Sequence, residues 1–169
     1  MLLVEPCCTQ KHLLALRNKL GDGGTAFFHG YGDVSLSELL PSLLVRYSEA
    51  DMVIVAPSIP DGAAETIAYW MNRQWARSDG KGKTDVIARL LLVTDLRPSK
   101  SPMASQWLDD NPFGERLELR SVQQNDTAII LPDIAFLGNV NLTYGGHFTA
   151  VATKNTKTID ALRSQYGTL

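Results

Sequence analysis

The order of apolar and polar residues predicts short strands and amphipathic helices that alternate through the first part of the chain. Three apolar runs have the length and the polar bounds of buried strands, namely 25–30, 51–58 and 85–95. Three segments have the three-four spacing of amphipathic helices, namely 10–20, 36–50 and 64–75. This alternation is typical of an α/β protein in which a sheet lies between helices.

After a short helix predicted at 102–110, the pattern changes to strands with little between them. Four such runs follow, at 115–122, 127–131, 134–138 and 147–153, and a helix at 157–167 closes the chain. No internal repeat or linker divides the sequence. We therefore expect a single domain, residues 1–169, of the α/β class, with a mixed β-sheet of about seven strands flanked by helices.

Composition limits the binding partners and the cellular compartment that can be expected for this protein. A net charge of −2 provides no whole-molecule attraction to nucleic acid or to an anionic membrane, so any such binding must come from a local patch. The two cysteines, Cys7 and Cys8, are adjacent, which does not suit ordinary disulfide geometry and favours a reducing compartment. The apolar start is too short for a signal peptide, and no long apolar run follows. We expect a cytoplasmic protein without a membrane segment.

Residues 125–169 resemble the motif-bearing end of a phospholipase D-like domain. That family has an HxKxxxxD motif on a strand, a short turn, a second strand ending in a GSxN-like motif, a third strand and a closing helix. Here the predicted strand at 134–137 leads into Gly138, Asn139, Val140 and Asn141, and a leucine–threonine pair follows. The resemblance implies a phospholipase D-like half-domain.

The catalytic positions of that family are not kept. Asn125 stands where the family has histidine, Thr127 where it has lysine, and Pro132 where it has aspartate, with Asp133 available if the turn is one residue shorter. In the family one histidine attacks phosphorus, another protonates the leaving group, and the lysines hold phosphate oxygens. An asparagine has no basic lone pair and a threonine carries no charge. The resemblance therefore implies a catalytically inactive domain that acts as a binding or scaffolding module.

Six residues form the candidate pseudo-active site: Asn125, Thr127, Asn139, Asn141, His147 and His29. His29 lies in a glycine-containing turn after a predicted strand, and His147 follows a double glycine before another. These two histidines leave an alternative open, a phosphodiesterase or nuclease with relocated histidine machinery. Two histidines without a carboxylate or cysteine make a weak metal site, so we expect no metal and no cofactor.

A local excess of positive charge gives a third interpretation. Between positions 73 and 100, seven basic residues stand against three acidic ones. The candidates for contact with nucleic acid are Arg73, Arg77, Lys81 and Lys83. No interleaved exposed aromatic residue is evident from the sequence, so this patch predicts weak, salt-sensitive binding of nucleic acid or a phosphate ligand at most, as in a nucleic-acid-binding accessory protein.

The resemblance also predicts a homodimer, because in the family two half-domains meet around their motifs. The contact would lie near Asn125, Gly138, Asn141 and His147, where the segment 140–144 adds apolar residues. Closed two-fold symmetry is the commonest arrangement for such a self-contact.

Overall fold

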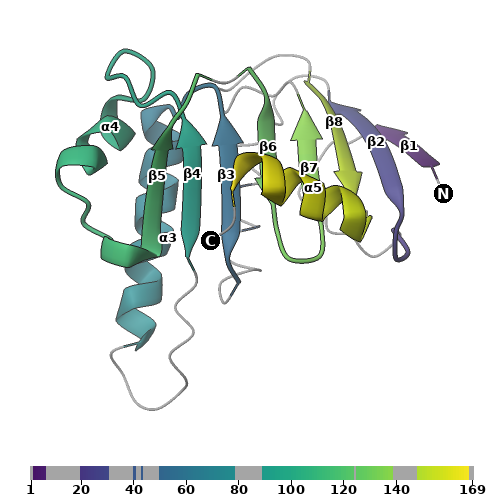
Figure 1. The fold of residues 1–169 in the computed structure, drawn as a ribbon, viewed down its shortest axis with the longest axis horizontal. Helices are drawn as coiled ribbons and strands as arrows, with labels where there is room; N and C mark the ends of the chain where they lie inside the picture. Colours follow the sequence, from purple (N-terminus) through teal and green to yellow (C-terminus); the bar gives the residue numbers. More distant parts are fainter. Residues whose placement is uncertain are drawn as a thin grey trace.

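The computed structural model describes residues 2–6, 20–30, 40, 43, 50–78, 89–123, 125–138 and 148–167. Eight strands form one sheet in the order β1-β2-β8-β7-β6-β3-β4-β5 (Figure 1). Their bounds are β1 Leu2–Pro6, β2 Thr25–Gly30, β3 Met52–Ala56, β4 Leu90–Thr94, β5 Leu117–Ser121, β6 Thr127–Ile130, β7 Ala135–Gly138 and β8 Phe148–Thr153. β1 and β2 are parallel, as are β3, β4 and β5, whereas β6 and β8 are antiparallel to both of their neighbours. The predicted mixed sheet is thereby confirmed.

Helices α3 (Asp61–Ser78) and α4 (Pro102–Asp109) lie behind the sheet in the view of Figure 1. Side chains alternate between the two faces of a strand, and in β3 Met52, Ile54 and Ala56 belong to the core on this side. Ile67 of α3 and Trp107 of α4 pack into the same core. Other helical residues bury apolar side chains here too, including Leu40 and Leu43, which lie within the segment predicted as the second helix.

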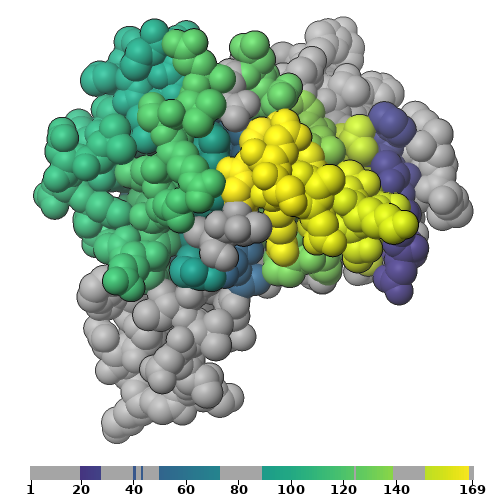
Figure 2. Space-filling model, viewed as in Figure 1, coloured from purple at the N-terminus to yellow at the C-terminus, as the bar shows by residue number. Residues whose placement is uncertain are grey.

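Helix α5 (Thr156–Tyr166) covers the middle of the opposite face (Figure 1). Val53 and Val55 of β3 point to this side, where they form a second core with Ile159 and Tyr166. Figure 2 shows α5 lying across this face, with β2 visible beside it. Accordingly Phe27 of β2 remains 42% exposed.

Coverage on both faces explains the continuous apolar runs in the sequence. All five residues of β3 are buried, and so are all five of β4, which is the pattern of strands in the interior of a covered sheet. β3 lies between β6 and β4 in the sheet order, so its predicted position near the middle is confirmed. A 3-10 turn, η1 (Gly114–Arg116), leads into β5 at the edge.

The sheet has one strand more than predicted. The seven expected strands are all present within their predicted ranges, and the additional one is β1, which pairs with β2 from Leu2↔Thr25 to Pro6↔His29. The helices predicted at 64–75, 102–110 and 157–167 correspond to α3, α4 and α5. The helix predicted at 10–20 lies outside the described residues except for Leu20. Leu20 is part of a bend.

Truncating a residue at the centre of this core should destabilise the protein strongly. Ile54 is 0% exposed and is paired with Leu92 on one side and Ile129 on the other. We expect Ile54→Ala to lower the free energy of unfolding by about 2–4 kcal/mol, because it removes buried methyl groups and leaves a cavity. Urea unfolding measures this change. Leu108→Ala is the control, since Leu108 is 53% exposed and its truncation should change stability by less than about 0.5 kcal/mol; equal losses would contradict the core assignment.

Candidate functional site

One edge of the sheet gathers the strand ends that carry the predicted motif. β2, β3, β4, β5 and β7 end at this edge, and the antiparallel strands β6 and β8 begin there. We call it the carboxyl edge and define it by Gly30, Ala56, Thr94, Thr127 and Gly138. In open α/β sheets, ligands bind outside the carboxyl ends of the strands, so this edge is the first place to look for a site.

Asn125 and Thr127 lie at this edge but in different environments. Asn125 is exposed and lies two residues before the start of β6. Thr127 is the first residue of β6, is 1% exposed and is paired with Gly138. Because the adjacent residue Ala128 belongs to the core under α5, Thr127 points to the face covered by α3 and α4. The position aligned with the family's lysine is therefore buried.

Pro132 lies at the other end of β6, away from the carboxyl edge. It is exposed in the turn that joins β6 to β7, where the backbone N–H of Leu131 donates to the carbonyl of Ile134 over 2.9 Å. Asp133 is in the same turn. Neither residue lies beside Asn125, since the whole length of β6 separates them.

Of the remaining pseudo-active-site positions, the structure describes only His29. Asn139, Asn141 and His147 lie outside the described residues, as does the segment 140–144 predicted for the dimer contact. The backbone of His29 is described, and it pairs with Thr149, one step before the pair formed by Gly30 and Phe148. The end of β2 thus lies beside the start of β8, the strand that His147 immediately precedes.

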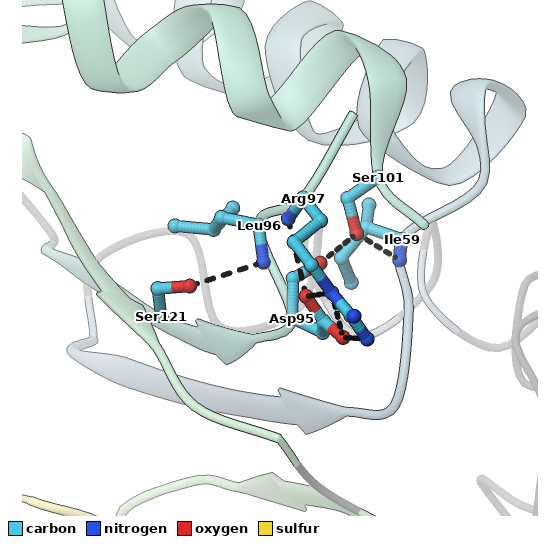
Figure 3. A network of polar contacts seen from close by, with 6 residues as sticks. All are labelled: Ile59, Asp95, Leu96, Arg97, Ser101 and Ser121. Atoms are coloured by element: carbon cyan, nitrogen blue, oxygen red, sulfur yellow. Dashed lines mark hydrogen bonds and ion pairs between the residues drawn. The ribbon is translucent and has the colours of Figure 1, made fainter. Parts of the chain in front are cut away.

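A network of hydrogen bonds fixes the loops of the carboxyl edge beyond β4 (Figure 3). The Ser101 hydroxyl donates to the carbonyl of Asp95 over 2.9 Å and accepts from the backbone N–H of Ile59, also over 2.9 Å. The hydroxyl of Ser121 accepts from the backbone N–H of Leu96 over 3.3 Å. The connections that follow β3 and β4 are thereby joined to each other and to the last residue of β5.

Asp95 holds Arg97 against this network. Nε of Arg97 donates to both carboxylate oxygens, over 2.9 and 3.0 Å, and Nη2 forms an ion pair with Oδ2 at 2.5 Å. The backbone N–H of Arg97 also donates to the carboxylate, over 3.1 Å. The side chain of Asp95 is 8% exposed and that of Arg97 is 57% exposed. The hydrogen bonds from Arg97 hold the pKa of Asp95 below its ordinary value.

Helix α5 is also connected to the carboxyl edge. The hydroxyl of Tyr166 donates to Oδ2 of Asp126 over 3.4 Å, and Asp126 stands between Asn125 and Thr127. Burial, together with the charge of Asp126, raises the pKa of Tyr166. Nη1 of Arg120 donates to the backbone carbonyl of Tyr166 over 3.3 Å, so the end of α5 is tied to β5 as well.

The structure describes only part of the predicted basic patch. Arg73 and Arg77 lie in α3, where their backbone is described, and Lys81 and Lys83 lie outside the described residues. Two other cations of the stretch are paired with carboxylates. Arg97 pairs with Asp95, and Nη2 of Arg89 lies 2.6 Å from Oδ2 of Asp51.

Tyr69 is a surface residue that the sequence did not single out. It lies in α3 and is 66% exposed. The helical pattern identified the residues that face the core, and an aromatic residue outside that set gave no separate signal. Tyr69 precedes Arg73 by four positions on the same helix.

The described residues contain no group of three or more His, Cys, Asp or Glu side chains that could hold a metal ion. None of the helices described is both long and apolar enough to cross a membrane.

No family model matches the chain, and no curated protein is significantly similar to it. Solved structures are similar in fold. Polyphosphate kinase from Porphyromonas gingivalis has a TM-score of 0.58 and 13% sequence identity, over 96% of this chain and 28% of the kinase. TrmBL2, an archaeal chromatin protein with a novel mode of DNA binding, has a TM-score of 0.49 and 17% identity, over 93% of this chain and 56% of that protein.

This chain therefore spans only part of either protein. At 13% identity the likeness to polyphosphate kinase shows the fold alone. It agrees with the expected α/β fold and mixed sheet.

Acidification should reveal the contribution of Asp95. Because its pKa in the folded protein lies below the ordinary value of 3.8, its stabilising effect is complete above that value and is lost as the pH falls through the folded pKa. We expect Asp95→Asn to lose less stability than the unmodified protein between about pH 7 and about pH 3 in urea unfolding. Asp109→Asn, a change at an exposed residue of α4, is the control. The same pH dependence in the Asp95→Asn and unmodified proteins would contradict this role.

Proposed function

We propose that the chain is a catalytically inactive phospholipase D-like half-domain that acts as a binding or scaffolding module. The observation that supports this most is the environment of Thr127, which occupies the position aligned with the family's phosphate-holding lysine. It is neutral and 1% exposed, so it provides no cation to a ligand at the carboxyl edge.

The aligned nucleophile position gives independent support. Asn125 is exposed, so a ligand can reach it, but its amide has no basic lone pair with which to attack phosphorus. Meanwhile the hydrogen bonds of Ser101 and Asp95 keep the nearby loops in fixed positions without using either residue. An edge whose loops are fixed in this way, and which has Asn and Thr at the positions aligned with the family's histidine and lysine, fits recognition better than turnover.

A second candidate function is a phosphodiesterase or nuclease that uses His29 and His147. The observation that favours this candidate is the pairing of His29 with Thr149, because His147 stands two positions before Thr149 in the sequence. A pair of imidazoles at such a place would serve as base and acid if both reached one phosphate. Loss of activity on substitution distinguishes this enzyme from the module.

We expect the purified protein to hydrolyse neither a chromogenic phosphodiester, nor phospholipid vesicles, nor single-stranded DNA, because the nucleophile and the phosphate-holding cation are missing. Asn125→His combined with Thr127→Lys should remain inactive, since a lysine at position 127 would enter a site that is 1% exposed. Product formation is measured by absorbance and by chromatography. Turnover that disappears in both His147→Ala and His29→Ala would establish the relocated enzyme instead.

We further propose that two copies associate through the carboxyl edge. Support comes from the resemblance of residues 125–169 to a family whose half-domains meet around their motifs, and from the exposure of Asn125 at that edge. The same patch would contact itself across a two-fold axis.

Light scattering at micromolar concentration should therefore report twice the chain mass of 18.6 kDa. Asn141→Arg should shift the protein toward the monomer, because the change places two like charges near the axis. Asn72→Arg, at an exposed position on α3, is the matched control and should leave the mass unchanged. A monomer at every concentration tested would refute the dimer.

A further inference from the structure

One line of apolar side chains crosses the sheet on the face that carries α5. Strand pairing places Phe27 of β2 beside Val151 of β8, and Val151 beside Leu137 of β7. Leu137 in turn pairs with Ala128 of β6, which pairs with Val55 of β3. Because paired residues share a face of the sheet, these side chains form a continuous apolar line.

The cover over this line ends partway along it. Val55 and Ala128 are 0% exposed and belong to the core under α5. Leu137 packs against the same core but is only half-buried, as is Val151, and Phe27 at the end of the line is 42% exposed. We call Phe27, Val151 and Leu137 the Phe27 row. The row extends the second core of the protein beyond the helix that covers it.

The sequence of β2 is typical of a strand that is covered on both faces. Residues 26–28 are consecutive apolar residues, and Ala26 is 0% exposed in the core on the side of α3 and α4. The opposite face of the same strand leaves Phe27 in solvent. A single exposed apolar side chain is common on protein surfaces, whereas adjacent ones that continue a core are typical of a surface that another protein covers.

The polar residues beside the Phe27 row are suited to burial. Thr25 pairs with Thr153 on the same face, and their hydroxyls share a hydrogen bond of 2.9 Å. The Thr153 hydroxyl also accepts from the backbone N–H of Asn155 over 3.2 Å. A protein that covers this surface therefore leaves neither hydroxyl without a partner. Neither these threonines nor the Phe27 row carries a charge, so the surface can meet a copy of itself without repulsion.

The Phe27 row lies next to the carboxyl edge, the part of the sheet through which two copies are proposed to associate. Leu137 immediately precedes Gly138, and Phe27 lies three residues before Gly30 in β2. Both glycines belong to the carboxyl edge as defined above. A contact made at that edge can therefore continue over the Phe27 row without a break.

We propose that a second copy of the chain covers the Phe27 row, so that these side chains form the apolar centre of the two-fold contact. The inference rests on the self-association proposed above and names the surface that stabilises it. A two-fold axis brings the same patch of both copies together, and an apolar patch without charge is complementary to itself. Phe27 has the largest side chain of the row and is its anchor.

Sedimentation velocity over a range of micromolar concentrations tests this role of Phe27. Phe27→Glu should raise the dissociation constant of the dimer by at least about 30-fold, because it removes the anchor and places a charge in the contact. Phe27→Leu keeps an apolar side chain and should remain dimeric. Tyr69→Glu is the matched control, since Tyr69 is also an exposed aromatic residue but lies in α3, across the sheet from α5. It should leave the dissociation constant unchanged.

Photocrosslinking measures the contact directly and does not depend on whether Phe27→Glu folds. With p-benzoylphenylalanine in place of Phe27, irradiation should produce a covalent species of twice the chain mass of 18.6 kDa. The same group in place of Tyr69 should produce none. Thermal unfolding of each variant verifies that it is folded.

Two results would overturn the inference in a protein that is dimeric: a folded Phe27→Glu variant that dimerises as tightly as the unmodified protein, or no crosslink from position 27. If Asn141→Arg still yields monomers in that case, the carboxyl edge alone forms the dimer and its proposal stands. A protein that is monomeric at every concentration and gives no crosslink refutes both the self-association and the covering of the Phe27 row by a second copy.

Discussion

The structure depends on the burial of β3 and β4 from both faces. A strand with five consecutive buried residues is stable only if each face of the sheet is covered, and here α3 and α4 cover one face while α5 covers the other. The chain leaves β3 for α3 and returns as β4, so both strands end at the same edge. The loops that carry Ile59 and Ser101 meet there as a direct result.

The parts of the fold that were predictable are those with a local signal. The apolar run of β3 marked a central strand because both of its faces need apolar residues, and the hairpin of β6 and β7 was marked by two short runs around Pro132. β1 was not predicted, because Leu2–Pro6 becomes a strand only through its pairing with β2. Such pairing is a tertiary interaction that the first residues do not encode alone.

The candidate site also has a part that the sequence predicted and a part that depends on tertiary structure. The sequence predicted a strand that begins at Thr127, and β6 begins there, with Asn125 two residues before it. Their different exposure depends on which face the strand turns to the helices, which a motif does not encode. The bond from Arg97 to Asp95 and the exposure of Tyr69 were also beyond the sequence, because loop geometry and the unburied side of a helix have no periodic pattern.

The position of β8 in the sheet has a consequence for how the chain folds during synthesis. β8 lies between β2 and β7, so β1 and β2 have no partner in the remainder of the sheet until residues 148–153 have been made. The side chains of Thr25 and Thr153, which meet at 2.9 Å, are 128 positions apart. Contacts between residues this far apart in the sequence form slowly, and strand edges that are still unpaired promote aggregation in the meantime. The nascent chain therefore carries β2 with an unpaired edge while residues 31–147 are being synthesised, and chaperones that recognise such edges are expected to bind it in this period.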